Sequence, residues 1–175
     1  MINIKRPIIT AIIIIICFLL ESTVFQGLSF ANITPNLIIV VTASFGFMRG
    51  KREGMLVGFF AGLLYDIFFG DLVGFYAMIY AVLGYINGYF RRIFYPEDIK
   101  LPLFLITASD FILGNVVCIF MFIMRSRFDY FYYLFHIIIP ELIYTTLVTL
   151  VLYQILLHIN QALEAEEKRS ASRFV

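Results

Sequence analysis

The chain has 175 residues, of which 62% are hydrophobic and 14% are charged, and its mean hydropathy is +0.94. A soluble domain of this size carries more polar surface, so the composition indicates an integral membrane protein. The formal net charge is only +1 and the basic residues form no extended patch along the sequence, which excludes nucleic-acid binding.

Apolar runs between charged or turn-forming residues predict six transmembrane helices in a single all-α membrane domain, residues 1–175. A bilayer-spanning helix needs about 20 apolar residues, so six spans leave no room for a separate soluble domain. The predicted spans are residues 8–25, 36–48, 54–69, 74–90, 101–124 and 130–157, followed by a polar cytoplasmic tail at 158–175. The second and third spans are shorter than the hydrocarbon layer is thick. We expect local thinning of the bilayer or packing of neighbouring helices to compensate for the mismatch.

The first predicted span begins after Lys5 and Arg6 and is rich in isoleucine, which suits contact with lipid or with an apolar helix of another protein. The same pattern also resembles a secretory signal with a cleavage site at residues 29–31. Glu21 lies between the apolar run and that site, and removal of the segment would leave five spans. We therefore expect the segment to be retained as a span.

The second span opens with Pro35, Asn36 and Leu37. Proline is tolerated at a helix start because its missing N–H would have no intrahelical acceptor there. Asparagine can cap the first free N–H groups.

The third span contains a stripe of small residues with one acid in it. Every fourth residue contributes to this stripe, which consists of Gly54, Gly58, Gly62, Asp66 and Gly70. Glycines in membrane helices let a neighbouring backbone approach closely. An acid within the membrane needs a partner or a wet cavity. The stripe therefore predicts that the third helix is the packed centre of the bundle.

Small residues recur three or four apart in the fourth span, at Ala77, Ala81, Gly84 and Gly88. The connection of residues 70–74 is short enough to force an antiparallel hairpin. We therefore expect the third and fourth helices to be the most closely packed pair.

The last span begins with an aromatic cluster at residues 129–135, which suits the external membrane interface. Pro140 is expected to break or kink the helix, with an interfacial piece before it and the true span after it. Glu164 stands four residues before Lys168, which favours a short, solvated cytoplasmic helix rather than a binding motif.

The basic residues predict the orientation by the positive-inside rule. If six helices alternate, all Lys and Arg residues except Arg125 and Arg127 fall on one side. Both termini are then cytoplasmic. A re-entrant hairpin in place of the second and third spans would instead bury Arg49, Lys51 and Arg52 at mid-membrane, at about 2.5 to 3.5 kcal/mol each.

Four acids lie within predicted spans: Glu21, Asp66, Asp110 and Glu141. They form either a proton or cation pathway, as in secondary transporters, or a set of interhelical hydrogen bonds. Asp110 lies nearest to mid-depth, and Thr107, Ser109 and Asn115 are its polar neighbours in sequence. The chain lacks the inverted repeats of many transporters, which favours the hydrogen-bonding interpretation.

The sequence predicts no enzyme, no metal and no cofactor. Cys17 and Cys118 lie inside predicted spans and are interpreted as packing residues. His136 and His158 have no ligand partners at metal-binding spacing. No nucleophile, base and acid can be placed together at a common depth.

Three elements resemble the MreD family of bacterial rod-shape-determining membrane proteins: Pro35 to Leu37, the stretch Gly58 to Asp66, and Gly74 at the start of the next helix. Size and six-span topology agree over nearly the whole chain. The positions carried over from the family motif are Pro35, Asn36, Leu37, Gly58, Gly62, Asp66 and Gly74.

The resemblance implies a component of the cell-elongation machinery that maintains rod shape. It implies action with the bitopic protein MreC and, in a wider complex, with MreB, RodA and penicillin-binding-protein synthases. It also implies a fold similar to the S-components of energy-coupling-factor transporters, so a vitamin-uptake subunit is the alternative. Those subunits commonly carry an Ala-x-x-x-Ala pattern on the first helix, where this chain has only Ala11.

Overall fold

The computed structural model describes residues 5–25, 27, 33–70, 72–93, 95, 99–125 and 130–172. Helices account for nearly all of these residues. The α-helices are α1 (Lys5–Leu19), α2 (Leu37–Arg49), α3 (Lys51–Phe69), α4 (Phe75–Asn87), α5 (Lys100–Arg125), α6 (Tyr130–Tyr133) and α7 (Ile139–Ser172). The predicted all-α class is therefore confirmed.

Three shorter helical segments extend these α-helices. A π-helix, η1 (Leu20–Phe25), continues α1, a 3-10 helix, η2 (Gly88–Ile93), continues α4, and a π-helix, η3 (Leu134–Ile138), joins α6 to α7. Among the described residues, Arg6–Phe25, Lys100–Phe120 and Tyr130–Lys168 are long and apolar enough to cross a membrane. The remaining α-helices of the bundle are shorter, and α2 is apolar along its length.

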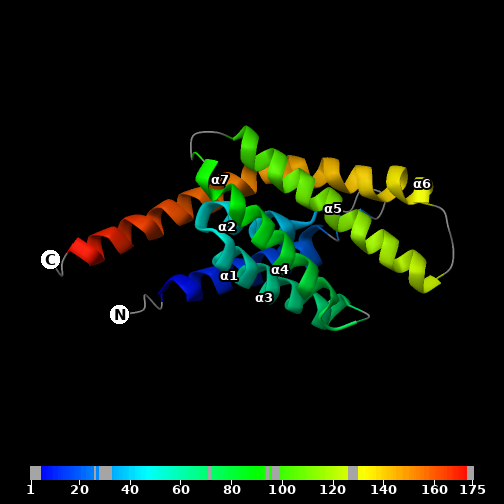
Figure 1. The fold of residues 1–175 in the computed structure, drawn as a ribbon, viewed down its shortest axis with the longest axis horizontal. Coiled ribbons are helices and arrows are strands. Elements are labelled where there is room, and N and C mark those ends of the chain that lie inside the picture. Colours follow the sequence, from blue (N-terminus) through cyan, green and yellow to red (C-terminus); the bar gives the residue numbers. More distant parts are fainter. Residues whose placement is uncertain are drawn as a thin grey trace.

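Both ends of the chain lie at the same end of the elongated bundle (Figure 1). The connection between α2 and α3 lies toward this end as well, and the connection between α3 and α4 lies toward the other. The side chain of Arg6 in α1 forms an ion pair of 3.0 Å with Glu167 in α7, which ties the start of the first helix to the last.

The centre of the bundle is α2, whose residues are all buried from Leu37 to Met48. It contacts α1, α3, α4, α5 and α7. The prediction that the third helix is the centre was wrong, because α3 buries only its small-residue face and exposes Phe59, Phe60 and Phe68. The composition of α2 and α3 did not show which of them is central, since helices facing lipid and helices buried in protein are both apolar.

The helices α3 and α4 form the most extensive contact among the described elements. A Cβ atom added to Gly58 would overlap the backbone carbonyl of Tyr80, and one added to Gly62 would lie 2.6 Å from Cα of Ala77. A Cβ on Gly84 would overlap the carbonyl of Gly54. The two backbones thus approach to a distance at which only hydrogen fits.

Of the predicted break or kink at Pro140, the break is wrong, because the helix continues past this residue. The helical course runs from Tyr130 to Ser172, and the π-helix η3 directly precedes the residues around Pro140. Within η3, the N–H of Ile139 donates to the carbonyl of Leu134. The wider turn is a local adjustment next to a proline, which lacks the N–H donor and would crowd the carbonyl four residues earlier in a regular α-helix.

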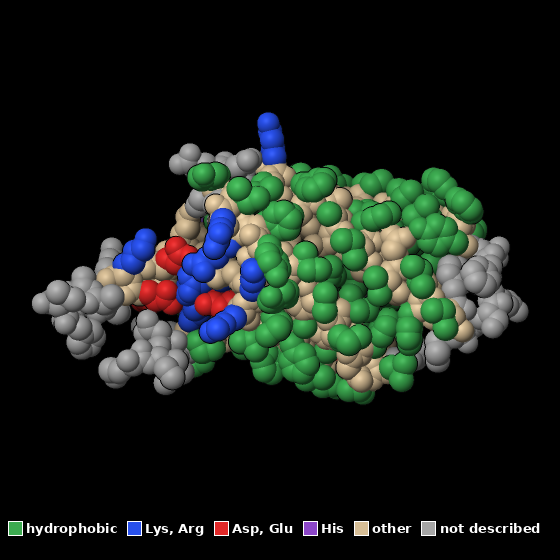
Figure 2. Space-filling view, viewed as in Figure 1, with side chains coloured by type: hydrophobic (Ala, Val, Ile, Leu, Met, Phe, Trp, Pro, Cys, Tyr) green, Lys and Arg blue, Asp and Glu red, His purple; other side chains and the backbone are tan. Residues whose placement is uncertain are grey.

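The outer surface of the bundle carries a broad apolar belt, and its Lys, Arg, Asp and Glu side chains gather toward one end in the view of Figure 2. Helix α1 contributes Ile8, Ile12, Ile15, Ile16 and Leu19, each about half exposed. Such a surface matches a membrane environment. Some sequence predictions fall on residues outside the described part of the chain. These are the conceivable cleavage site at 29–31, the last residues of the tail at 173–175, Arg127 and Asp129.

Candidate functional site

Four residues form a chain of hydrogen bonds inside the bundle, here called the polar chain: Tyr80 in α4, Asn36 at the N-cap of α2, Thr145 in α7 and Asp110 in α5. The Tyr80 hydroxyl lies 2.9 Å from Nδ2 and 3.1 Å from Oδ1 of Asn36. The backbone N–H of Asn36 donates to Oγ1 of Thr145 at 3.1 Å, and Thr145 is hydrogen-bonded to Asp110. All four residues are buried, so the polar chain joins α4, α2, α7 and α5 in the interior.

Asn36 is the centre of this arrangement because it is also the N-cap of α2. Its Oδ1 accepts the N–H of Ile39 at 3.0 Å, which satisfies one of the free donors of the first turn. Pro35 precedes it and Leu37 begins the helix, as predicted from the Pro-Asn-Leu element. One asparagine side chain therefore starts α2 and connects it to Tyr80.

Glu21 supplies the second cap of α2. This residue lies in η1, and its Oε2 accepts the N–H groups of Leu37 and Ile38 at 2.8 and 3.2 Å. A carboxylate is favourable here because the helix N-terminus carries a partial positive charge. Glu21 thus attaches the end of the first helix to the start of the central one.

Asp110 differs from the other acids, because its Oδ2 is buried without a hydrogen-bond partner in the described part of the chain. The polar neighbours predicted for it from sequence bond elsewhere: Ser109 to Asn87, Thr107 to Thr146, and Asn115 to Tyr130. The hydrogen-bond partner of the Asp110 carboxyl group is instead Thr145. Helix α7 carries Thr145 to Asp110 where it crosses α5. Glu141, the fourth predicted acid, lies in the first turn of α7 and is half-buried.

Asp66 is the N-terminal cap of α4, although it belongs to the last turn of α3. Its Oδ2 accepts the N–H groups of Gly74 and Ala77, each at 2.9 Å, and its Oδ1 accepts that of Tyr76 at 3.0 Å. Gly74 has φ 100°, a left-handed conformation that favours glycine. The single acid of the glycine stripe therefore holds the α3–α4 hairpin at its turn.

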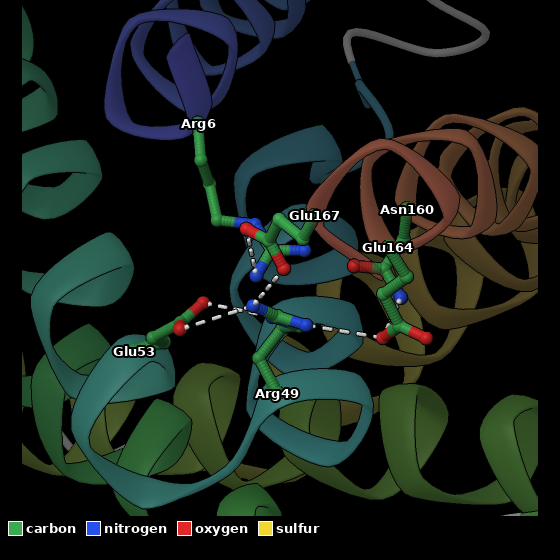
Figure 3. A network of polar contacts seen from close by, with 6 residues as sticks. All are labelled: Arg6, Arg49, Glu53, Asn160, Glu164 and Glu167. Carbon is green, nitrogen blue, oxygen red and sulfur yellow. Dashed lines mark hydrogen bonds and ion pairs between the residues drawn. The ribbon is translucent and has the colours of Figure 1, made fainter. Parts of the chain in front are cut away.

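A second polar cluster lies near the chain termini and is centred on Arg49 (Figure 3). The Arg49 guanidinium lies 3.1 Å from Glu53 and 3.1 Å from Glu164, and 3.6 Å from Glu167. Glu164 also accepts from Asn160 at 3.2 Å. The predicted tail helix is present and exposes Ala162, Ala165 and Lys168. In addition, its Glu164 and Glu167 form ion pairs with Arg49 and Arg6, which the sequence did not predict.

The described residues contain no group of three or more His, Cys, Asp and Glu side chains that could hold a metal ion. Nδ1 of His136 lies 3.1 Å from the carbonyl of Tyr132, and Nδ1 of His158 lies 2.9 Å from that of Gln154. Both cysteines are free and buried. The polar groups of the interior therefore cap helices and connect them.

Sequence reasoning missed Tyr80, Thr145 and Gly46. Tyr80 lies three residues after Ala77 and four before Gly84, so helical spacing alone places it on the small-residue face. Gly46 lies close to the backbone of Gly84: a Cβ added to Gly46 would be 2.8 Å from the carbonyl oxygen of Gly84. It belongs to a different span from the stripe, and only the packing of α2 against α4 reveals it.

The comparison with family models identifies MreD, described as rod shape-determining protein MreD, and the match covers residues 3–162. This range contains the glycine stripe, the Pro-Asn-Leu element and the polar chain, whereas Glu164 and Glu167 lie beyond it. Neither the comparison with curated proteins nor that with solved structures gave a match.

Proposed function

Because the chain belongs to the MreD family of rod shape-determining membrane proteins, we propose that it is a non-catalytic scaffold of the bacterial elongation machinery. In this role it holds the transmembrane helix of an MreC-like bitopic protein and thereby supports lateral peptidoglycan synthesis. The family match over residues 3–162 is the observation that carries this proposal.

The uses of the buried acids support a scaffold. Asp66 and Glu21 accept backbone N–H groups at helix starts, and Asn36 caps α2 and contacts Tyr80. These groups determine how helices meet, which is what a binding platform requires. Asp66 and Glu21 are thereby occupied in holding helices. Oδ2 of Asp110 has no hydrogen-bond partner in the described part of the chain, so Asp110 is the acid that a transport function would use.

We propose the exposed face of α1 as the surface for the partner helix. Ile12, Ile15 and Ile16 are each about half exposed, and Cys17 and Phe18 on the other face pack into the core. A second apolar helix packing against this face needs no polar match within the bilayer.

We also propose six crossings with both termini in the cytoplasm. The Arg6–Glu167 pair brings the start of α1 and the end of α7 together, which supports an even number of crossings. The basic connection between α2 and α3 lies toward the same end. The short length of α2 is tolerable because protein, rather than lipid, surrounds it.

The experiment that tests the scaffold is affinity purification of the tagged chain in mild detergent, with mass spectrometry of what co-elutes. We expect an MreC-like protein, and we expect its recovery to fall with Ile12→Ser and Ile16→Ser together. Co-elution of an ATPase module together with a vitamin would contradict the proposal and favour the S-component alternative. Depletion of the chain should convert rod-shaped cells to round ones.

A further inference from the structure

The connection between α2 and α3 lies against the end of α4, and this contact brings together basic residues that are about 40 positions apart in sequence. The Arg91 side chain covers Gly50, where an added Cβ would lie 3.2 Å from Cδ and 3.3 Å from Nη1 of Arg91. A Cβ on Gly88 would overlap the backbone of Lys51. Lys51 and Arg91 therefore lie at this contact, and together with their chain neighbours Arg52 and Arg92, which are both exposed, they are here called the basic patch.

Arg49 is neutralised by acidic side chains, and the charges of the basic patch are not neutralised in this way. Arg49, only a few residues away, is 13% exposed and is paired with Glu53, Glu164 and Glu167. The exposed guanidinium groups of the patch, those of Arg52, Arg91 and Arg92, form no ion pair within the described part of the chain. The Glu53 carboxylate, the nearest acid in sequence, is directed to Arg49.

Lys51 is held in place by two tyrosines at the edge of the patch. Its Nζ lies 3.2 Å from the ring centroid of Tyr89 and 5.8 Å from that of Tyr85. The two hydroxyl groups are 3.2 Å apart, with Tyr89 donating to Tyr85, and both rings are exposed. Tyrosine at such a boundary is typical of the headgroup region of a membrane.

An apolar surface begins next to the patch and continues along the same helices. Met55 and Phe59 follow Lys51 at intervals of four on α3, and Val82 and Met78 precede Tyr85 on α4. These four side chains are 41% to 62% exposed. In Figure 2 the basic side chains border the apolar surface directly. A ligand that fits both surfaces carries a negative charge at one end and hydrocarbon at the other.

We propose that the basic patch binds the phosphate headgroup of an anionic phospholipid, whose acyl chains lie along the exposed faces of α3 and α4. The guanidinium groups of Arg91, Arg92 and Arg52 supply the hydrogen-bond donors for the phosphate. A soluble acidic protein would match the charges but not the adjoining apolar strip.

The test is native mass spectrometry of the purified full-length protein in neutral detergent, titrated with phosphatidylglycerol or phosphatidylcholine. We expect the wild type to prefer phosphatidylglycerol. The triple variant Arg52→Gln, Arg91→Gln, Arg92→Gln should lose about fivefold in affinity for each charge removed. Lys168→Gln, which removes an exposed basic residue of the tail, is the matched control and should bind as the wild type does.

Two further arms separate the lipid from other anions. Glycerol phosphate in millimolar excess should leave the lipid bound, since it lacks the acyl chains. A hexaglutamate peptide should bind no better to the wild type than to the triple variant. Equal binding of the two phospholipids, unchanged affinity in the triple variant, displacement by glycerol phosphate, or patch-dependent peptide binding would each overturn the proposal.

Discussion

The Oδ2 atom of Asp66 accepts a hydrogen bond of 2.9 Å from the backbone N–H of Ala77, which lies in the next helix. The carboxylate accepts two other N–H groups, those of Gly74 and Tyr76. Asp66 is 1% exposed, so water cannot replace a lost acceptor. Asp66 therefore fixes the turn of the α3–α4 hairpin, in addition to the close packing of the two helices.

We predict that Asp66→Ala lowers protein stability more than Asp66→Asn does. Alanine leaves three N–H groups without an acceptor, the buried one of Ala77 and the part-buried ones of Gly74 and Tyr76, and the loss at the buried one alone costs about 1 to 3 kcal/mol. Asparagine keeps one acceptor oxygen and turns its amide toward the remaining donors. Thermal unfolding in detergent should rank the proteins wild type, Asn and Ala. Equal losses of stability in the two variants would contradict a role for the hydrogen bonds that asparagine can keep. Loss of rod shape in Asp66→Asn with normal stability and partner binding would indicate that ionisation itself is needed, as in a proton pathway.

Gly58→Ala should destabilise the protein by about 1 to 3 kcal/mol, since the added methyl group must push α3 away from the backbone of α4. Gly27→Ala is a suitable control, because a Cβ at Gly27 meets nothing within 4 Å. The measurement is the amount of folded protein in membranes and its melting temperature. If the Gly58 variant matched the Gly27 variant, the close approach of the helices would not contribute to stability.

Arg49→Gln should loosen the end of the bundle where the termini lie, because it leaves the carboxylates of Glu53 and Glu164 without their cation and Glu167 with Arg6 alone. These acids are partly exposed, so we expect a loss of about 1 to 2 kcal/mol, below that of a fully buried pair. Arg52→Gln, at an exposed position in the same connection, should change stability by less than about 0.5 kcal/mol. Proteolysis of α7 after its last buried turns should accelerate only in the Arg49 variant.

Cysteine labelling tests the proposed orientation. Val73, 75% exposed in the connection between α3 and α4, should react with an impermeant thiol reagent from outside after Val73→Cys. Arg52→Cys should react only in opened cells. Both changes belong in a background with Cys17→Ala and Cys118→Ala, since these are the native cysteines. The reverse labelling pattern would contradict cytoplasmic termini.

Asp110→Asn tests whether the unpartnered carboxylate oxygen has a role beyond structure. Asparagine can keep the hydrogen bond with Thr145 and replaces Oδ2 with a neutral donor, so a scaffold should retain rod shape and partner recovery. Thr145→Val should be more harmful, because it removes the acceptor for the backbone N–H of Asn36. Loss of rod shape in Asp110→Asn with normal partner recovery would favour a proton pathway.

Composition and the lengths of the apolar runs were sufficient to predict a helical membrane protein and the approximate ends of most helices, and the resemblance of Pro35 to Leu37, Gly58 to Asp66 and Gly74 to a family motif predicted the family. The apolar runs and the basic connections are local features, and each reflects the energy of placing a segment in or beside a bilayer. The four-residue spacing likewise placed Gly54, Gly58, Gly62 and Asp66 on one face, and all four are buried.

Only the tertiary structure decided which helix is central and which partner each polar group has. Both α2 and α3 are apolar, and only the packing shows that α2 is enclosed while α3 exposes its phenylalanines. Asn36 forms hydrogen bonds with Tyr80, 44 positions away in sequence, and with Thr145, 109 positions away. Arg49 binds Glu164, which is 115 positions away. Such pairs arise where helices cross, and a crossing depends on the shape of both surfaces, which no single stretch of sequence contains.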